Sequence, residues 1–375
     1  MKRSAKLPAA LGYRMPAEWE PHTSTWLAWP HFRGDWPGKF EPIPWVYAEI
    51  IRNLARHERV DLIVSNVSEE TKARAILGKA DALSENVHFH HWRTDRVWMR
   101  DSGCIFLTPP ADRSSSQSDD SHKNDAKPCA ALIALHFQFN AWAKYDNYKL
   151  DAKVGARMSK AAGAQVVRPT FGARREFPIV LEGGSIDVNG RGTLLTTEEC
   201  LLSTTQQRNP SMNRAAYEQM FADYFGIQSV IWLGEGIEGD DTHGHVDDLT
   251  RFVAPDTVVT MVEANPQDAN YSALHHNLGR LRAARDQDGH RLNVVEIPMP
   301  RPVVFEGRRL PASYANFYIA NGAVLVPVFN DPNDRIALDT LADVFPDREV
   351  VGIYSGDLIW GFGAMHCMTQ QQPSV

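Results

Sequence analysis

The C-terminal segment places a cysteine directly after a histidine and a glycine-bearing loop, in the run GFGAMHC that ends at Cys367. A free cysteine is among the most often buried residue types and usually serves as a small core side chain. A cysteine beside a flexible loop can also be a nucleophile, because glycines let the backbone approach a substrate closely. This segment alone leaves both interpretations open, so the choice depends on which groups accompany the thiol.

A first polar cluster lies in the run TDRVWMRDSG, where Asp95 and Asp101 flank Trp98. Such a run is typical of a surface turn stabilised by ion pairs. It is also typical of a cation site, because a carboxylate such as Asp101 accepts two parallel N–H bonds from a guanidinium. The aromatic face of Trp98 can lie against the same delocalised charge. The run therefore supplies a candidate substrate carboxylate and a candidate substrate aromatic.

A second candidate carboxylate is Glu182, which precedes two glycines in the run LEGGSI. A glutamate in this position is commonly a solvated turn residue. The two glycines would also permit a close approach of the backbone, and the carboxylate would then be available to orient a neighbouring side chain.

The densest cluster is the run GDDTHGHVDDLTRF. It contains Asp240, Asp241, His243, His245, Asp247 and Asp248. A solvated acidic loop would explain the aspartates but not the interleaved histidines. Two imidazoles, from His243 and His245, could share a metal ion as H-x-H pairs do. Alternatively, His245 and Asp247 lie two apart on one strand, where they would project together as a general base and a substrate carboxylate.

These clusters become a coherent site if Cys367 is the nucleophile. A cysteine nucleophile needs a proton acceptor, a substrate anchor and an electrophile suited to sulfur. Several carboxylates would anchor a cation and would repel a carboxylate or phosphate substrate. A guanidinium fits, because it is planar, positive and electrophilic at its central carbon once it is held in place.

The elements that must position these residues alternate between short strands and helices. Apolar spacing predicts a helix over 44–57. Asn-Gly turns or short polar breaks between apolar runs predict hairpins over 185–197, 251–263 and 316–329. The fold class is therefore α/β, or α+β if the sheets are mostly antiparallel. No linker divides the chain, so we expect a single catalytic domain spanning 1–375 and built from several small units.

Residues 108–128 form a stretch rich in Ser, Asp, Lys and Pro that has no apolar residue larger than alanine. Such a stretch cannot bury enough apolar surface to offset the entropy lost on ordering. We expect a flexible insertion there, between two strands.

Composition narrows the class of protein. Hydrophobic residues make up 43% of the chain and charged residues 23%, as in ordinary globular proteins. The net charge of -7 argues against a nucleic-acid partner. No apolar run is long enough for a signal peptide or a membrane span, which predicts a cytoplasmic protein with no membrane partner. Four cysteines without C-x-x-C spacing, Cys104, Cys129, Cys200 and Cys367, predict reduced thiols.

Taken together, these runs resemble the agmatine deiminase family, also called the Porphyromonas-type peptidyl-arginine deiminase family, among the guanidine-modifying enzymes. The similarity extends through nearly the whole chain, which makes it far more specific than any one motif. The matching runs are MPAEWEPHTSTWLAWP, TDRVWMRDSG, FNAWAKYDNY, LEGGSIDVNGRGTLLTTEECLL, RNP, DTHGHVDDLTRF and HCMTQQQP.

The resemblance implies a pentein-type fold, a five-bladed α/β propeller of pseudo-fivefold strand-and-helix units around one site. It implies Cys367 as nucleophile, His245 as acid–base residue, Glu182 as the group that orients the histidine, and Asp101 and Asp247 as guanidinium-binding carboxylates. It also implies that no metal or other cofactor is needed, which disfavours the metal interpretation of the H-x-H pair.

The implied activity is that of a hydrolase of carbon–nitrogen bonds in linear amidines, converting agmatine to N-carbamoylputrescine and ammonia through a covalent amidino-cysteine. The implied partner is a small cationic guanidine, and a homo-oligomer is compatible with the family. The alternatives are peptidyl-arginine or another small guanidine as substrate, or a non-catalytic guanidine-binding relative. The manganese-dependent ureohydrolase signatures are missing.

The chain departs from the family pattern at a few positions. Phe362 and Ala364 stand where the pattern has a glycine and an asparagine in the cysteine loop. His243 stands in place of an aspartate or asparagine, and Cys104 in place of a proline. None of these departures removes a candidate catalytic residue.

Overall fold

A computed structural model describes residues 7–110, 131–172 and 175–375 of the chain. The expected insertion at 108–128 lies outside these residues except for its first three positions. Helices of the described residues are α1 (Ile43–Leu54), α2 (Val67–Lys79), α3 (Met99–Ser102), α4 (Val154–Ala161), α5 (Glu198–Leu202), α6 (Arg214–Phe225), α7 (Tyr271–Ala283), α8 (Asn333–Val344) and α9 (Met365–Met368). In the part of the chain that is described, no helix has both the length and the apolar character needed to cross a membrane.

Five sheets of three or four strands carry the fold of the described residues, beside two small two-stranded ribbons. The strands of the first three sheets are β1 (His22–Ala28), β2 (Arg59–Val64), β3 (Val87–His91) with β20 (Gln370–Pro373); β4 (Ile105–Leu107), β5 (Ile133–Leu135), β6 (Gln165–Val167); and β9 (Asp187–Val188), β10 (Thr193–Thr197), β11 (Ser229–Leu233). The strands of the other two are β12 (Thr250–Ala254), β13 (Thr257–Val262), β14 (Asn293–Pro298); and β17 (Tyr318–Ile319), β18 (Ala323–Val328), β19 (Glu349–Tyr354). The ribbons are β7 (Thr170–Phe171) with β8 (Phe177–Pro178), and β15 (Val304–Phe305) with β16 (Arg308–Arg309).

One arrangement recurs in all five sheets. A short strand pairs antiparallel with a central strand, and the central strand pairs parallel with a third. A helix connects each parallel pair, as α7 connects β13 to β14 and α8 connects β18 to β19, because parallel neighbours require a crossover. In the first sheet the antiparallel partner of β1 is β20, so the last strand of the chain pairs with the first.

The three predicted hairpins are confirmed as the antiparallel pairs β9–β10, β12–β13 and β17–β18. The predicted helix over 44–57 is confirmed as α1, which buries Ile50, Ile51 and Leu54 at helical spacing. Because every large sheet contains parallel as well as antiparallel pairs, the class is mixed α/β rather than α+β.

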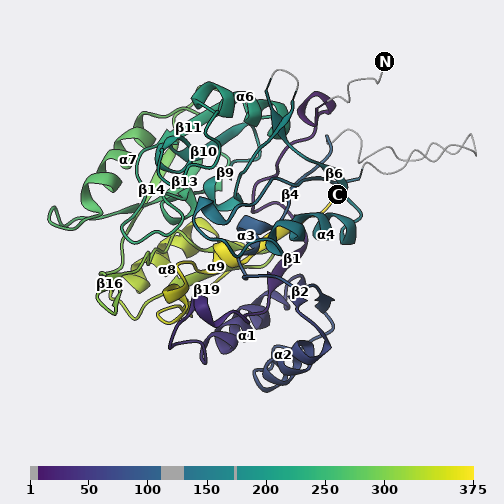
Figure 1. Cartoon of the computed structure of the whole chain (residues 1–375). Helices are drawn as coiled ribbons and strands as arrows, with labels where there is room; N and C mark the ends of the chain where they lie inside the picture. Colours follow the sequence, from purple (N-terminus) through teal and green to yellow (C-terminus); the bar gives the residue numbers. More distant parts are fainter. Residues whose placement is uncertain (1–6, 111–130, 173–174) are drawn as a thin grey trace, which may run out of the picture.

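Local signals explain where the helices begin and end. The Asn213 side chain accepts a bond from the Ala216 backbone at 3.0 Å and caps the start of α6. Gly226 ends that helix in the left-handed conformation, with φ of 76°. Figure 1 shows α3 and α9 near the middle of the molecule, whereas α2, α6 and α7 lie toward its outside.

Candidate active site

Each of the five units contributes a segment to one central site, and each segment directly precedes the antiparallel strand of its unit. Asp101 lies in α3 before β4, and Glu182 precedes a 3-10 turn (Gly183–Ser185) before β9. His245 and Asp247 lie at a 3-10 turn (Val246–Asp248) before β12. Asn316 precedes β17, and Cys367 lies in α9 before β20. The recurrence of the unit thus explains how residues far apart in sequence come together.

Cys367 is 4% exposed, and its thiol is held by Asn316. The Asn316 Nδ2 donates to Sγ at 3.1 Å and to Asp248 Oδ1 at 3.0 Å. The Asn316 Oδ1 accepts backbone N–H groups of the cysteine loop, including that of Cys367 at 3.3 Å. Burial raises the pKa of the Cys367 thiol well above its usual value, and the charges of Asp247, Asp248 and Asp101 add to that effect.

His245 is fully buried and surrounded by carboxylates. Its Nδ1 lies 3.9 Å from Asp101 Oδ1 and 4.0 Å from Asp247 Oδ1, and its Nε2 lies 3.7 Å from Glu182 Oε2. Neither nitrogen has a hydrogen-bond partner among the described residues. Burial lowers the pKa of His245, but the charge of Asp101 and contacts with Cys200 and Glu182 outweigh it and raise the pKa well above the ordinary value.

Asp101 and Asp247 lie on the same side of His245. Asp101 accepts from the Trp142 indole at 2.9 Å and from the Gly184 backbone at 3.2 Å. Burial raises the pKa of Asp101 to about 6, a rise that His245 opposes. The Asp247 Oδ2 lies 3.6 Å from the Cys367 Sγ, so one carboxylate adjoins both the histidine and the thiol.

Glu182 lies on the opposite side of the imidazole. The Arg208 Nε donates to its Oε1 at 3.2 Å, and both side chains are buried. Burial acts to raise the pKa of Glu182, but Arg208 and His245 outweigh it and lower the pKa to about 2. Its Oε2 faces His245 without a hydrogen-bond partner among the described residues. Glu182 is therefore an ionised carboxylate aimed at the histidine.

The second of the two glycines after Glu182, Gly184, matters because of what adjoins it. A Cβ atom at Gly184 would lie 2.5 Å from His245 Nδ1, 3.0 Å from Asp247 Oδ2 and 3.1 Å from Asp101 Oδ1. Such a group would fill the space that these three side chains share. Glycine is therefore required here by close approach rather than by an unusual backbone angle.

A pocket leads from the surface to the thiol. Asp101, Trp98 and Cys367 line its inner part, and Arg96, Asp241 and Phe362 also line it. Trp98 is 5% exposed, and its ring lies beside Gly363 of the cysteine loop, where an added Cβ would come within 2.7 Å of it. The structure therefore brings Cys367, His245, Glu182, Asp101, Asp247 and Trp98 together.

Asp95, which the sequence groups with Asp101, lies elsewhere. Its Oδ2 accepts from the backbone of Leu150 at 2.7 Å, and its own backbone N–H donates to Asp151. Asp95 therefore joins two loops and does not face the thiol.

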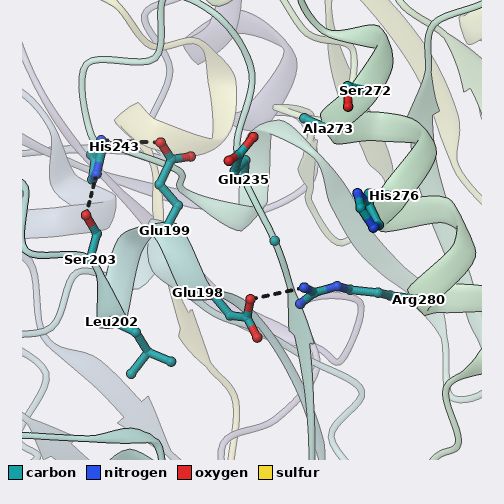
Figure 2. Close-up of a pocket in the computed structure, with 11 residues that line it drawn as sticks. Glu198, Glu199, Leu202, Ser203, Glu235, His243, Ser272, Ala273, His276 and Arg280 are labelled. Carbon is teal, nitrogen blue, oxygen red and sulfur yellow. Dashed lines mark hydrogen bonds and ion pairs between the residues drawn. The ribbon is translucent and has the colours of Figure 1, made fainter.

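His243 and His245 do not converge. The His243 Nε2 lies 3.0 Å from the Ser203 hydroxyl, and its Nδ1 lies 3.4 Å from Glu199 Oε1. Figure 2 shows these contacts in a separate surface pocket, with Glu235 beside Glu199 and with His276 and Arg280 on the side opposite His243. The two imidazoles thus have different neighbours, which is not the arrangement that the metal interpretation requires.

The expectation that His245 and Asp247 share a strand is wrong. The Leu249 backbone N–H donates to the Val246 carbonyl at 2.9 Å and closes a 3-10 turn, and β12 begins only at Thr250. Val246 is buried in the core, which fixes the turn. The two polar side chains still face the same space, but because of a turn rather than strand alternation.

Sequence reasoning missed several supporting residues. His366 bridges Asp247 Oδ2 at 2.6 Å and Glu18 Oε2 at 2.9 Å, and Asn316, Arg208 and Trp142 hold the thiol, Glu182 and Asp101 as described above. Arg208, Trp142 and His366 lie within the matched runs RNP, FNAWAKYDNY and HCMTQQQP, which gave a signal. Asn316 carries no comparable signal of its role, because it depends on packing between distant segments.

A buried thiol beside a histidine and several carboxylates defines a site suited to attack on a cationic carbon. Comparison with known proteins agrees with that class. Residues 14–373 match the model of the Porphyromonas-type peptidyl-arginine deiminases, and the chain belongs to this family.

Relatives of known name cover nearly the whole chain. The chain is 34% identical to an agmatine deiminase of Pseudomonas syringae pathovar tomato, over 98% of this chain and 97% of the relative. It is also 34% identical to one from Pseudomonas aeruginosa, over 100% of this chain and 99% of the relative. A solved agmatine deiminase of Enterococcus faecalis superposes with a TM-score of 0.85 at 28% identity, covering 100% of this chain and 99% of that one.

Proposed function

We propose that this protein is an agmatine deiminase, which hydrolyses agmatine to N-carbamoylputrescine and ammonia. The observation that carries the proposal is the convergence of Cys367, His245, Asp101 and Asp247 in a chain whose relatives are agmatine deiminases. Cys367 and Asp101 line one pocket, and His245 and Asp247 are buried directly behind them. The whole chain acts as one catalytic domain, and the reaction needs neither a metal nor an organic cofactor.

The guanidinium binds between Asp101 and Asp247. Both carboxylates are buried, and each has an oxygen close to Nδ1 of His245, so a planar cation in the shared space would meet both. Gly184 leaves that space open. The indole of Trp98 supplies an aromatic wall for the delocalised charge.

Substrate binding also activates the thiol. In the free enzyme, burial and three carboxylates raise the pKa of Cys367, so the neutral thiol predominates. A guanidinium bound between Asp101 and Asp247 introduces a positive charge beside the sulfur, which favours the thiolate. The thiol proton passes to solvent when the substrate binds and returns after product release, so the reactive anion is formed mainly when a cationic substrate is present.

In the first half-reaction the thiolate attacks the guanidinium carbon and forms a carbon–sulfur bond. His245 is protonated at neutral pH because its pKa is raised, and it gives its proton to one terminal nitrogen. The carbon–nitrogen bond breaks and ammonia leaves. The substrate chain remains attached through its own nitrogen, so the intermediate is an N-alkylated amidino-cysteine.

In the second half-reaction neutral His245 takes a proton from water, and the resulting hydroxide adds to the same carbon. The carbon–sulfur bond then breaks, the thiolate leaves, and the hydroxyl proton is lost as the ureido carbonyl forms. The sum is one guanidinium and one water converted to one ureido product and one ammonium. Glu182 orients the imidazole and stabilises its charged form.

We also propose that the five units form a five-bladed α/β propeller. The same unit recurs in five sheets, and each sheet contributes the segment before its antiparallel strand to the site. The pairing of β20 with β1 joins the end of the chain to its beginning, as closure of a ring of blades would require.

The test is ammonia release from agmatine, arginine and an N-blocked arginine amide, with EDTA present. We expect release from agmatine, lost in Cys367→Ser and retained in Cys104→Ser, a matched change at another buried cysteine. Acid quenching during turnover should trap the substrate adduct on Cys367, detectable by peptide mass spectrometry. Release from the blocked arginine alone would replace agmatine with peptidyl-arginine, and release from none would favour a non-catalytic binder.

A further inference from the structure

The outer part of the pocket carries more positive than negative side chains. Asp241 is the carboxylate that lines this part; it is buried, and both of its oxygens are occupied. Lys144 and Arg308 contact Oδ1, the latter at 3.4 Å, and the Tyr145 hydroxyl donates to Oδ2 at 2.5 Å. Asp241 is therefore shared between two cations before any ligand arrives.

Arg96 adds a third cation to this region. Its Nη1 lies 2.7 Å from Asp35 Oδ1, its guanidinium stacks 4.0 Å above the Tyr145 ring, and its buried Nε has no hydrogen-bond partner among the described residues. Burial raises the pKa of Asp35 to about 7, and Arg96 opposes the rise. Near neutral pH, Asp35 is consequently a partial counter-charge for Arg96.

Phe362 places Arg308 beside the pocket. The Arg308 guanidinium lies 4.0 Å from the centre of the Phe362 ring, which itself lines the pocket. Phe362 occupies the left-handed region with φ of 69°, where a glycine is the ordinary choice. A side chain is thus retained at a conformationally costly position, and that side chain supports a cation.

The sign of charge therefore reverses along the pocket. Asp101 lines the pocket beside the thiol, and Asp247 contacts the thiol from behind it. Arg96 and Asp241 line the pocket as well, and the more exposed Arg308 and Lys144 contact Asp241. Agmatine carries a positive charge at both ends, and its ammonium would have to compete with Lys144 and Arg308 for Asp241. A molecule with a guanidinium at one end and a carboxylate at the other matches both regions.

We propose that this pocket also accepts ω-guanidino carboxylates, with Arg308 and Arg96 binding the substrate carboxylate while Asp101 and Asp247 bind its guanidinium. The proposal rests on the deiminase activity proposed above and adds a second substrate class to the same site. The chemistry is unchanged: ammonia leaves from the covalent adduct, water adds, and an ω-ureido carboxylate is released.

The experiment compares agmatine with 4-guanidinobutanoate. The two have nearly the same length, because the carboxylate oxygens of the second take the place of the ammonium of the first. We expect wild-type enzyme to turn over both. In Arg308→Gln, kcat/KM for 4-guanidinobutanoate should fall about 10-fold through loss of a charge-assisted contact, and kcat/KM for agmatine should rise.

Arg335→Gln is the matched control, because Arg335 is an exposed arginine of α8 that pairs with Asp339. Binding to Cys367→Ser, measured by calorimetry, gives a readout independent of turnover. Turnover of agmatine with neither turnover nor binding of 4-guanidinobutanoate overturns this inference and leaves the proposed function intact. If the wild type turns over 4-guanidinobutanoate and Arg308→Gln turns it over equally well, the role assigned to Arg308 is overturned. Turnover of neither compound overturns both proposals.

Discussion

Two regions of the site differ in charge, in exposure and in how strictly their side chains are held. We call them the bottom, which contains Cys367, His245, Glu182, Asp101 and Asp247, and the mouth, which contains Arg96, Lys144, Asp241, Arg308 and Phe362. At the bottom, His245, Glu182 and Asp247 are fully buried, and the carboxylates have fixed donors. At the mouth, the Arg308 side chain is 48% exposed and rests on one aromatic ring. Buried charges need an exact set of partners, whereas half-exposed charges tolerate change. Under the two proposals above, the bottom would determine the reaction, and the mouth would determine which guanidine is preferred.

The largest loss of activity is expected when His245 is replaced. His245→Gln removes the proton donor and acceptor of both half-reactions, and we expect kcat to fall by roughly 10³-fold. The fall should be the same for agmatine and for 4-guanidinobutanoate, because both meet the same bottom. Steady-state kinetics with the two compounds tests this, and unequal losses would mean that His245 also discriminates between substrate tails.

A smaller but still large effect is expected at Gly184. Gly184→Ala introduces a Cβ into the space shared by His245, Asp101 and Asp247, and displacement of the guanidinium should lower kcat/KM by about 100-fold. Gly279→Ala is the matched control, because Gly279 lies inside α7 with nothing within 4 Å of its added Cβ. The control should keep full activity and gain up to about 1 kcal/mol of stability. Equal activity in the two variants would contradict the assigned site.

The pH dependence of kcat/KM and of stability tests the role of Asp101 at the bottom of the pocket. Because burial raises the pKa of this carboxyl to about 6, kcat/KM for both compounds should fall as pH drops through about 6. The contribution of Asp101 to the free energy of unfolding changes in the opposite direction, falling as pH rises. A carboxyl whose pKa is higher folded than unfolded stabilises the fold below the unfolded pKa and loses that contribution as pH rises through about 6.

The measurement for stability is the unfolding free energy of wild type minus that of Asp101→Asn. The difference should shrink by on the order of 1–3 kcal/mol between about pH 4 and pH 7. A difference that stays constant or grows with pH would show that Asp101 is not the group whose pKa is raised.

The smallest expected effect is at the mouth. Phe362→Gly removes a left-handed non-glycine residue, which favours stability, and loses ring contacts with Trp360 and Arg308, which opposes it. The free energy of unfolding should therefore change little. The ratio of kcat/KM for 4-guanidinobutanoate over agmatine should fall about 3-fold, since Arg308 loses its support. An unchanged ratio would separate Phe362 from specificity.

Much of the site is readable from the sequence because its residues lie in compact polar runs at the ends of elements. The candidates Cys367, His245, Glu182, Asp101 and Asp247 all lie in such runs, and the structure brings them together. The sequence does not show which other side chain holds each of these candidates in place. Asn316 contacts the thiol across 51 positions, a relationship that depends on how two units pack.

The fold, too, has elements that can be predicted from the sequence and elements that cannot. The antiparallel hairpins are predictable because a turn and two apolar runs are adjacent in sequence. The strand β20 is not, because the run Gln370–Pro373 is polar and is buried by partners far away in sequence, among them β1 and the Arg100 side chain. The 3-10 turn at Val246–Asp248 is not predictable either, because alternation over three residues does not distinguish a strand from a single 3-10 turn.

The pairing of β20 with β1 also has a consequence for biosynthesis. β1 and β20 are far apart in the sequence, so the strand that completes this sheet is synthesised long after β1. Cys367 lies in α9, directly before β20, and it can meet His245 and the carboxylates only once α9 has been synthesised. The site is therefore incomplete in any nascent chain that stops short of α9.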